Sequence, residues 1–305
     1  MGFLSPLDSL FMLILRRDGG LRVWAPAKVN LHLEVLGRRP DGYHELATLM
    51  VAVGLYDTLE FREAPAGTVR LRCDQPALSA GPDNLVHRAA ELVRRRSGHA
   101  GGVDIRLWKR IPLAAGLAGG SSDAAATLAG LNRLWRLGWT RAELAALGAE
   151  LGSDVPFFFW TPAAWCTGRG ERVEPVPLGR PLDLVLACPP AGLSTAEVFR
   201  GVTVPAAPAG GAEARRAAAA GDVEELGRRL HNRLQPAAER LCPAVAGLCA
   251  RLAGLGPAGQ MMSGSGSAVF ALCRHPGEAL RIARALRSVR EEREGARVLI
   301  VRSCD

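Results

Sequence analysis

A glycine-rich turn that runs directly into a helical pattern most constrains what this chain can fold into. The stretch IPLAAGLAGGSSDAAATLAGLNRLW occupies Ile111 to Trp135 and predicts a helix over 122–137. Glycines allow a backbone to approach a ligand closely, and a helix N-terminus offers free N–H groups. The turn is therefore either a seat for phosphate groups or a tight packing turn. No lysine follows Gly119 and Gly120, so it is not the GxxxxGK[ST] loop.

The charge composition narrows the choice of ligand. The chain has 38 basic residues and a formal net charge of +8; only Lys28 and Lys109 are lysines, which leaves 36 arginines. The charge suits an anionic partner, or it reflects the arginine bias of a GC-rich genome. Where almost every basic residue is an arginine, a lysine indicates a position that needs a compact ammonium group. The alternative is that the two lysines are present by chance. The seven cysteines form no CxxC pair, which argues against a zinc site or a disulfide framework and favours a reducing cytoplasm.

Strand and helix patterns are mixed along the chain, which predicts an α+β fold with two lobes. Asp83 or Asn84 caps the first helical pattern, and Thr140 with Glu143 forms a capping box before another. The low-complexity stretch 204–222 is predicted to be a mobile loop. The predicted strands cover 21–37, 46–63, 102–112, 157–160, 163–176 as a hairpin, 182–190, 259–272 around a glycine turn, and 296–303.

The first twenty residues contain the short apolar run Leu10–Leu15. This run is too short to cross a bilayer and lacks a preceding basic region. We therefore expect residues 1–20 to be a loose extension or the product of a misassigned start codon rather than a membrane anchor.

Three further stretches carry residues of catalytic type. Lys28 and Asn30 lie two apart in a strand pattern, so their side chains share one face, either in a site or as solvated groups of an edge strand. Asp154 follows a predicted helix and precedes Pro156. It is either a catalytic carboxylate or a turn residue whose side chain bonds its own backbone. The glycine turn at 262–267 is either a second ligand loop or a plain hairpin.

Taken in order, four segments resemble the signature segments of the GHMP kinases. They are PAKVNLHLEVLGRRPDGYHEL, the glycine-rich stretch quoted above, LGSDVPFFF and MSGSGSAVFAL. Within this family, the PDGYHE segment and the doubled glycine before SSDAA resemble one branch in particular. Its members act on a cytidine-diphosphate-linked methylerythritol in non-mevalonate isoprenoid synthesis. The resemblance covers roughly residues 21–303. It implies an α+β, two-lobed GHMP-kinase fold with the active site in the cleft between lobes, an ATP-binding domain over 21–180 and a second domain over 181–305.

The resemblance also implies roles for individual residues. Asp154 would accept the proton of the acceptor hydroxyl, Lys28 would keep Asp154 ionised, and Asn30 would orient the same hydroxyl. A base clamp of Tyr43, His44 and Phe199 would read the cytosine. The implied nucleotide-binding residues are Asn84, Lys109, Pro112, Leu113, Ala114, Ala115, Gly116, Leu117, Ala118, Gly119, Gly120, Ser121 and Ser122.

The resemblance is less informative at a few positions. Asn232 matches a family asparagine for which the sequence supplies no role. The resemblance implies that ATP binds together with Mg²⁺, but no carboxylate in the sequence is a clear ligand for that ion. A contact from the hydroxyl of Ser121 or Ser122 to the metal is the weakest of the implied roles. Alanines replace glycines of some relatives at 114, 115 and 118, which is compatible with phosphate contact if their φ angles stay negative.

Three rival functions are a GHMP kinase for another small alcohol, a non-catalytic ligand sensor and a nucleic-acid binder. The PDGYHE segment and Phe199 argue against the first, and the retention of Lys28 with Asp154 argues against the second. The arginines are dispersed rather than clustered with aromatic residues, which argues against the third. We therefore expect a cytoplasmic enzyme, monomeric or homodimeric, whose partners are ATP and its small-molecule acceptor, with no nucleic acid and no membrane.

Overall fold

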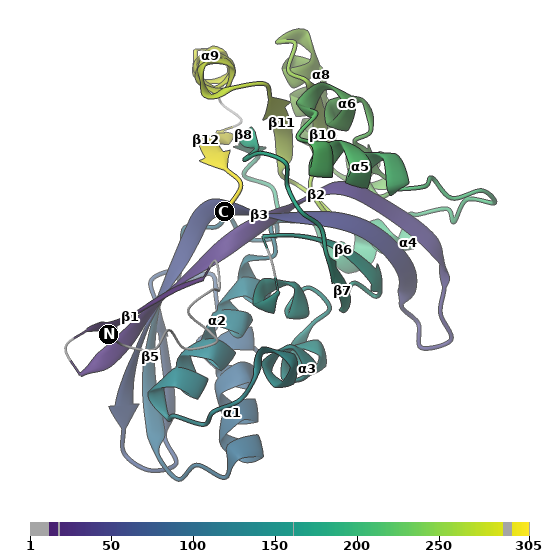
Figure 1. Cartoon of the computed structure of the whole chain (residues 1–305). Coiled ribbons are helices and arrows are strands. Elements are labelled where there is room, and N and C mark those ends of the chain that lie inside the picture. The colour runs from purple at the N-terminus through teal and green to yellow at the C-terminus, as the bar shows by residue number, and fades with distance from the viewer. Residues whose placement is uncertain (1–11, 18, 161, 289–294, 305) are drawn as a thin grey trace. The chain divides into compact units, whose positions relative to one another are not determined.

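The chain forms two compact units in a computed structural model, which describes residues 12–17, 19–160, 162–288 and 295–304 (Figure 1). Both units are discontinuous in sequence. Unit 1 takes in residues 1–27, 55–111 and 118–161, and unit 2 takes in 28–54, 112–117 and 162–305. The two longest strands, β2 (Gly20–Arg38) and β3 (His44–Ala64), contribute to both units. The observed mixture of strands and helices is the predicted α+β class.

Unit 1 combines paired strands with a group of helices. β1 pairs antiparallel with the start of β2, β5 pairs antiparallel with the end of β3, and β4 pairs parallel with β5. Helix α2 packs closely on β3, because a Cβ atom at Gly130 would lie 2.8 Å from the ring of Phe61. The remaining elements are β1 (Leu13–Arg17), β4 (Val69–Cys73), β5 (Gly102–Trp108), α1 (Leu85–Ser97), α2 (Gly119–Leu134), α3 (Arg141–Leu151) and the 3-10 helix η1 (Pro156–Phe159).

Unit 2 contains a four-stranded antiparallel sheet in the order β10-β11-β8-β12, whose core is shared with α7, α8 and α9. The β10 to β11 connection confirms the predicted strand, glycine turn and strand. β6 pairs with β3 and β7, and β9 pairs with β2. The elements are β6 (Ala163–Gly168), β7 (Arg172–Pro175), β8 (Asp183–Cys188), α4 (Thr195–Arg200), α5 (Ala212–Ala220), α6 (Val223–Arg228), β9 (His231–Asn232), α7 (Gln235–Leu241), α8 (Pro243–Gly254), β10 (Gly259–Met262), β11 (Val269–Cys273), α9 (Pro276–Arg287) and β12 (Arg297–Arg302).

Local helix signals in the sequence are confirmed. Asn84 caps α1 by accepting a hydrogen bond from the backbone N–H of Val86 at 2.9 Å. Thr140 and Glu143 form the predicted capping box of α3. Helix α2 begins three residues earlier than predicted and ends at Leu134, so its first turn contains both glycines of the GG pair. No helix in the described part of the chain is long and apolar enough to span a bilayer.

Three predicted segments differ from the structure. Within the predicted mobile loop 204–222, residues 212–220 form α5, because alanine and arginine have high helix propensity. The predicted strand after Asp154 is the 3-10 helix η1; its phenylalanines are buried, as expected, but a short apolar run does not by itself distinguish strand from helix. Of the predicted loose extension 1–20, residues 13–17 form β1, and Met12 is buried. Residues 1–11, with the start of the apolar run, lie outside the described residues.

Candidate active site

Lys28 and Asn30 lie on one face of β2 in unit 2, as their spacing predicts. The Lys28 ammonium donates to Asn30 Oδ1 at 2.6 Å and to the carbonyl oxygen of Gly116 at 3.2 Å. The Asn30 amide donates to Thr48 Oγ1 at 2.8 Å, and this hydroxyl donates to the carbonyl oxygen of His32 at 2.6 Å. Only 3% of Lys28 and 2% of Asn30 is exposed. The solvated edge-strand alternative is therefore wrong, since this lysine is buried.

The second glycine turn lies against these two side chains. Ser263 Oγ donates to the Gly116 carbonyl at 3.1 Å and accepts from the Asn30 backbone N–H at 3.4 Å. A Cβ atom at Gly264 would lie 3.2 Å from Lys28 Nζ and 3.3 Å from Asn30 Oδ1, and the φ angle there is +54°. Glycine is therefore required both by the backbone conformation and by the close approach. The turn is part of the candidate site.

Asn232 has a structural role that sequence reasoning did not supply. Its Nδ2 donates to the carbonyl oxygens of Met262 and Gly264, both at 2.8 Å, and its Oδ1 accepts from the backbone N–H of Leu234 at 2.9 Å. Asn232 itself is buried. It therefore fixes the glycine turn in place. Only the pairing of β9 with β2, a contact between distant parts of the sequence, brings it there.

The glycine-rich loop that links unit 2 to unit 1 adopts left-handed backbone angles at three places. The φ angles are +48° at Ala114, +72° at Gly116 and +53° at Ala118. The condition that the loop alanines keep negative φ is therefore wrong for Ala114 and Ala118. Such angles cost an alanine of order 1–2 kcal/mol relative to ordinary conformations. Strain of this kind concentrates at ligand-binding loops, which agrees with a phosphate seat rather than a simple packing turn.

Lys109 lies at the start of α2 in unit 1 and contacts two buried carboxylates. Its ammonium forms ion pairs with Asp57 and with Asp123, the latter at 2.7 Å. A Cβ atom at Gly119 would lie 3.1 Å from Lys109 Nζ, so the ammonium lies beside Gly119, while the nucleotide-binding role of Lys109 stays a prediction. Burial lowers the pKa of Lys109, but the two carboxylates outweigh it and raise the pKa overall. Burial raises the pKa of Asp123 to about 7, against the lowering effect of Lys109.

Sequence reasoning did not find Asp57 and Asp123. Asp57 Oδ1 also accepts from the backbone N–H groups of Arg110 at 2.5 Å and Ile111 at 2.9 Å, which fixes the chain just before the loop. Two carboxylates around one ammonium leave one excess negative charge, so a proton on Asp123 balances the cluster near neutral pH. Asp123 stands in the quoted motif, but only the fold brings Asp57 to it.

The serines at the start of α2 differ in their suitability as metal ligands. Ser122 is fully buried and its Oγ has no hydrogen-bond partner among the described residues, whereas Ser121 is partly exposed. In the part of the chain that the structure describes, no group of three His, Cys, Asp or Glu side chains could hold a metal ion. Of the two serines, Ser121 has the side chain that a bound ion could contact, since Ser122 is enclosed.

Asp154 and Asn84 belong to unit 1. Asp154 is half-buried in the turn between α3 and η1. Asn84 uses its side chain to cap α1 and donates to the Ser79 carbonyl at 2.6 Å. The catalytic role of Asp154 and the adenine-side role of Asn84 stay predictions.

The predicted base clamp is partly assembled in unit 2. The rings of His44 and Phe199 are stacked, with centroids 5.1 Å apart and planes 27° apart. Tyr43 is exposed, and the guanidinium of Arg169 lies 4.8 Å from the centre of its ring. Burial, together with the charge of Arg38, lowers the pKa of His44, so its ring is neutral at pH 7. Its Nε2 is buried and has no hydrogen-bond partner within the described segments.

Comparisons with known proteins place this geometry in a family. The model of the GHMP kinases N terminal domain matches residues 84–161, and that of the GHMP kinases C terminal matches residues 214–291. A 4-diphosphocytidyl-2-C-methyl-D-erythritol kinase of Pelotomaculum thermopropionicum is 44% identical over 271 residues, 88% of this chain and 94% of that protein. The chain belongs to the 4-diphosphocytidyl-2-C-methyl-D-erythritol kinase family of the GHMP kinases. It is therefore an enzyme, an ATP-dependent small-molecule kinase.

Two further similarities agree with this family. The kinase of the same name from Shouchella clausii is 42% identical over 283 residues, covering 90% of this chain and 93% of that protein. The crystal structure of a 4-(cytidine 5'-diphospho)-2C-methyl-D-erythritol kinase matches with a TM-score of 0.77 and 38% identity, over 93% of this chain and 99% of that one. A homoserine kinase from Cytophaga hutchinsonii has a TM-score of 0.74 at 19% identity over 95% of this chain and 96% of that one, a likeness of fold alone. The predicted GHMP-kinase fold is confirmed; the domain boundaries 21–180 and 181–305 stay predictions.

Proposed function

We propose that this chain transfers the γ-phosphoryl group of ATP to a hydroxyl of 4-diphosphocytidyl-2-C-methyl-D-erythritol, giving the 2-phosphate in the non-mevalonate route to isoprenoid precursors. The names and extensive coverage of its relatives support this acceptor. The observation that carries the proposal is the buried Lys28 ammonium, which bonds Asn30 and the Gly116 carbonyl and lies next to both glycine segments. A buried ammonium beside two glycine turns is suited to offset the charge of a phosphoryl group in transfer.

In the proposed reaction, the acceptor oxygen bonds to the γ-phosphorus, the bond from that phosphorus to the β,γ-bridging oxygen breaks, and ADP leaves. The hydroxyl proton passes to the carboxylate of Asp154. Lys28 is the charge partner of Asp154 in this step and offsets charge on the transferred group. A carboxylate is a weak base, which suits a loose transition state in which the proton leaves late.

The remaining groups bind and orient. Asn30 donates to Thr48 and accepts from Lys28, so its amide is fixed in one orientation beside the reacting hydroxyl. The N–H groups at the start of α2 would bind phosphate oxygens of ATP. Mg²⁺ would neutralise phosphate charge when bound with the nucleotide, and the Ser121 hydroxyl is the protein group that would reach it.

The cytosine ring is proposed to lie at the His44–Phe199 stack. Aromatic rings stack on any base, and the unpartnered Nε2 of a neutral His44 can bond the polar edge of cytosine. Tyr43 is exposed beside them and would cover the other side of the base. This clamp distinguishes the proposed acceptor from a free sugar alcohol.

A coupled assay of ADP release tests the proposed function. The acceptors are 4-diphosphocytidyl-2-C-methyl-D-erythritol, methylerythritol phosphate, mevalonate and homoserine, each with ATP and Mg²⁺. We expect turnover only with the cytidine-linked acceptor, and a reduction of about 10²- to 10⁴-fold in the Asp154→Asn variant, which keeps the side-chain shape. Equal turnover of methylerythritol phosphate, or of any acceptor without cytidine, would show that the assignment is wrong.

A further inference from the structure

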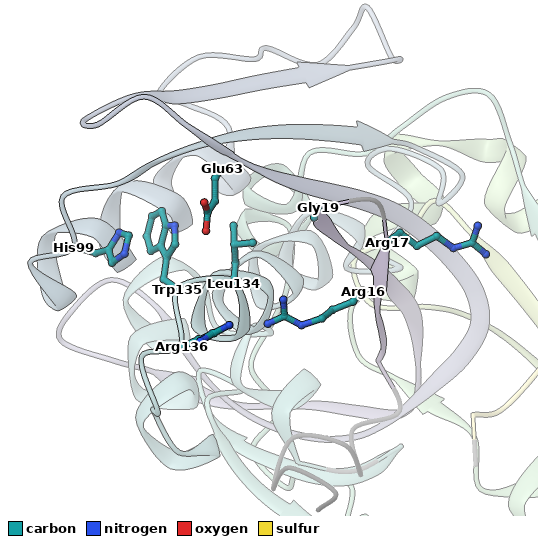
Figure 2. Close-up of a pocket in the computed structure, with 9 residues that line it drawn as sticks. Arg16, Arg17, Gly19, Glu63, His99, Leu134, Trp135 and Arg136 are labelled. Atoms are coloured by element: carbon teal, nitrogen blue, oxygen red, sulfur yellow. The ribbon is translucent and has the colours of Figure 1, made fainter. Parts of the chain in front are cut away.

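Unit 1 contains a pocket of about 470 Å³ at the C-terminal end of α2, a size usual for small-ligand sites (Figure 2). Its walls come from the β1–β2 hairpin, the end of β3, the segment after α1 and the residues that follow α2. The side chains that matter to its chemistry are Arg16, Glu63, His99, Leu134, Trp135 and Arg136.

The pocket is separate from the glycine-rich loop. Helix α2 runs for 16 residues from Gly119 to Leu134, and the loop lies at its first turn. At 1.5 Å per residue, roughly 24 Å separate the two ends of the helix. The β1 wall, moreover, belongs to the first twenty residues, which match none of the GHMP signature segments. The pocket is therefore not a part of the candidate active site.

Two guanidinium groups face each other in this pocket. Arg16 and Arg136 extend toward one another, whereas Arg17 points away (Figure 2). The guanidinium groups of Arg16 and Arg136 have no ion-pair or hydrogen-bond partner within the described segments, although those of other arginines in unit 1 do, such as Arg96 with Glu150. Paired guanidinium groups bind phosphate or carboxylate oxygens with good geometry.

The backbone at Arg136 shows that its position is specified by the fold. Its φ angle is +54°, in the region that favours glycine, and it directly follows the end of α2, where glycine is the usual residue. The backbone N–H of Leu137 closes the helix by donating to the Asn132 carbonyl at 3.0 Å. An arginine here costs stability that a glycine would avoid, and it directs a charge into the pocket.

The opposite side of the pocket is apolar. Trp135 and Leu134 are 7% and 8% exposed, and the Trp135 ring stacks on His99 with centroids 4.5 Å apart and planes 13° apart. The indole Nε1 is buried and has no hydrogen-bond partner within the described segments. Glu63 is the single acidic group of the lining, so the described walls carry a net positive charge.

We propose that this pocket binds a small organic phosphate, with the phosphate between Arg16 and Arg136 and an apolar portion on Leu134 and Trp135. Glu63 opposes the anion and restrains the affinity. The proposal is independent of the function proposed for the active site.

The test measures binding of hexyl phosphate by calorimetry, with the nucleotide site filled by ADP. Arg16→Gln and Arg136→Gly should each weaken binding by about 10-fold or more, since each loses charge-assisted hydrogen bonds. Glycine suits the φ angle at 136, so the second variant stays folded. Glu63→Gln should tighten binding several-fold. Arg70→Gln, an exposed arginine of β4 outside the pocket, is the matched control and should bind as the wild type does.

Two comparison ligands test whether both the phosphate and the apolar part of the ligand contribute to binding. Inorganic phosphate and hexanol should each bind at least 10-fold more weakly than hexyl phosphate, because each lacks one half of the proposed ligand. Unchanged binding in both arginine variants, or weaker binding in Glu63→Gln, would overturn the proposal. Tighter binding of hexylamine than of hexyl phosphate would show a cation site instead and would overturn it as well.

Discussion

Asn232 offers the sharpest prediction about how the site is held together. In an Asn232→Ala variant, the carbonyl oxygens of Met262 and Gly264 and the backbone N–H of Leu234 lose their partners, and all three residues are buried. Each unsatisfied buried group costs about 1–3 kcal/mol, so the free energy of unfolding should fall by roughly 3 kcal/mol or more. Because Gly264 lies against Lys28, turnover should also fall, by about 10-fold or more, in protein that is still folded.

Asn132→Ala is the matched control. Asn132 is 4% exposed and also bonds backbone groups through its side chain, with two bonds, to the N–H and the carbonyl of Trp139, both at 3.0 Å, against three for Asn232. It lies near the end of α2 in unit 1, and among the described residues its side chain bonds only to Trp139. Chemical denaturation gives the stability of both variants, and ADP release well below the melting transition gives turnover. If the two variants lose turnover equally at equal loss of stability, the positioning role of Asn232 is refuted.

Three further predictions concern the base clamp, the buried charge cluster and the loop. Phe199→Ala breaks the stack with His44, so the KM for the cytidine-linked acceptor should rise about 5- to 150-fold while the KM for ATP stays the same; an unchanged acceptor KM argues against the clamp. The pKa of Asp123, raised by burial to about 7, exceeds the unfolded value of about 3.9, so its contribution to stability is complete below pH 4 and is lost as the pH rises through 7. The melting temperature of wild type minus that of Asp123→Asn should therefore decrease between pH 5 and pH 8, and a constant difference contradicts the assignment. Ala118→Gly should stabilise the protein by up to about 1 kcal/mol because φ is +53°, whereas Ala115→Gly, with no positive φ, should destabilise it by a similar amount; denaturation curves with the same sign for both refute the strain.

Local features were predictable from local sequence. The caps at Asn84 and Thr140 depend on residues within one helical turn, and the shared face of Lys28 and Asn30 depends only on strand periodicity. The burial of Lys28 was not predictable in this way. β2 is buried on both faces, so its polar residues are enclosed as well, and that follows from what packs on the strand rather than from the strand.

The parts of the site that sequence reasoning missed depend on distant contacts or on backbone conformation. Asp57 reaches Lys109 from β3, and Asn232 reaches the glycine turn from β9, over separations that no motif spacing encodes. The left-handed angles of Ala114 and Ala118 contradict the local preference of alanine, so only the surrounding structure imposes them. Helix α5 was different, since its alanine-rich sequence carried a helical signal that low complexity concealed.

The central claim, that Lys28 and Asp154 serve one transition state, is tested most directly by single-turnover phosphoryl transfer at saturating ATP. The four proteins are the wild type, Lys28→Arg, Asp154→Asn and the double variant. Lys28 is 3% exposed and bonded to Asn30 at 2.6 Å, so a guanidinium, which is larger and has a fixed fork of donors, cannot take its place without displacing neighbours. We expect Lys28→Arg to lose most of its rate and the double variant to be little slower than the slower single variant. A Lys28→Arg enzyme at the wild-type rate, or losses that multiply fully in the double variant, would contradict the claim.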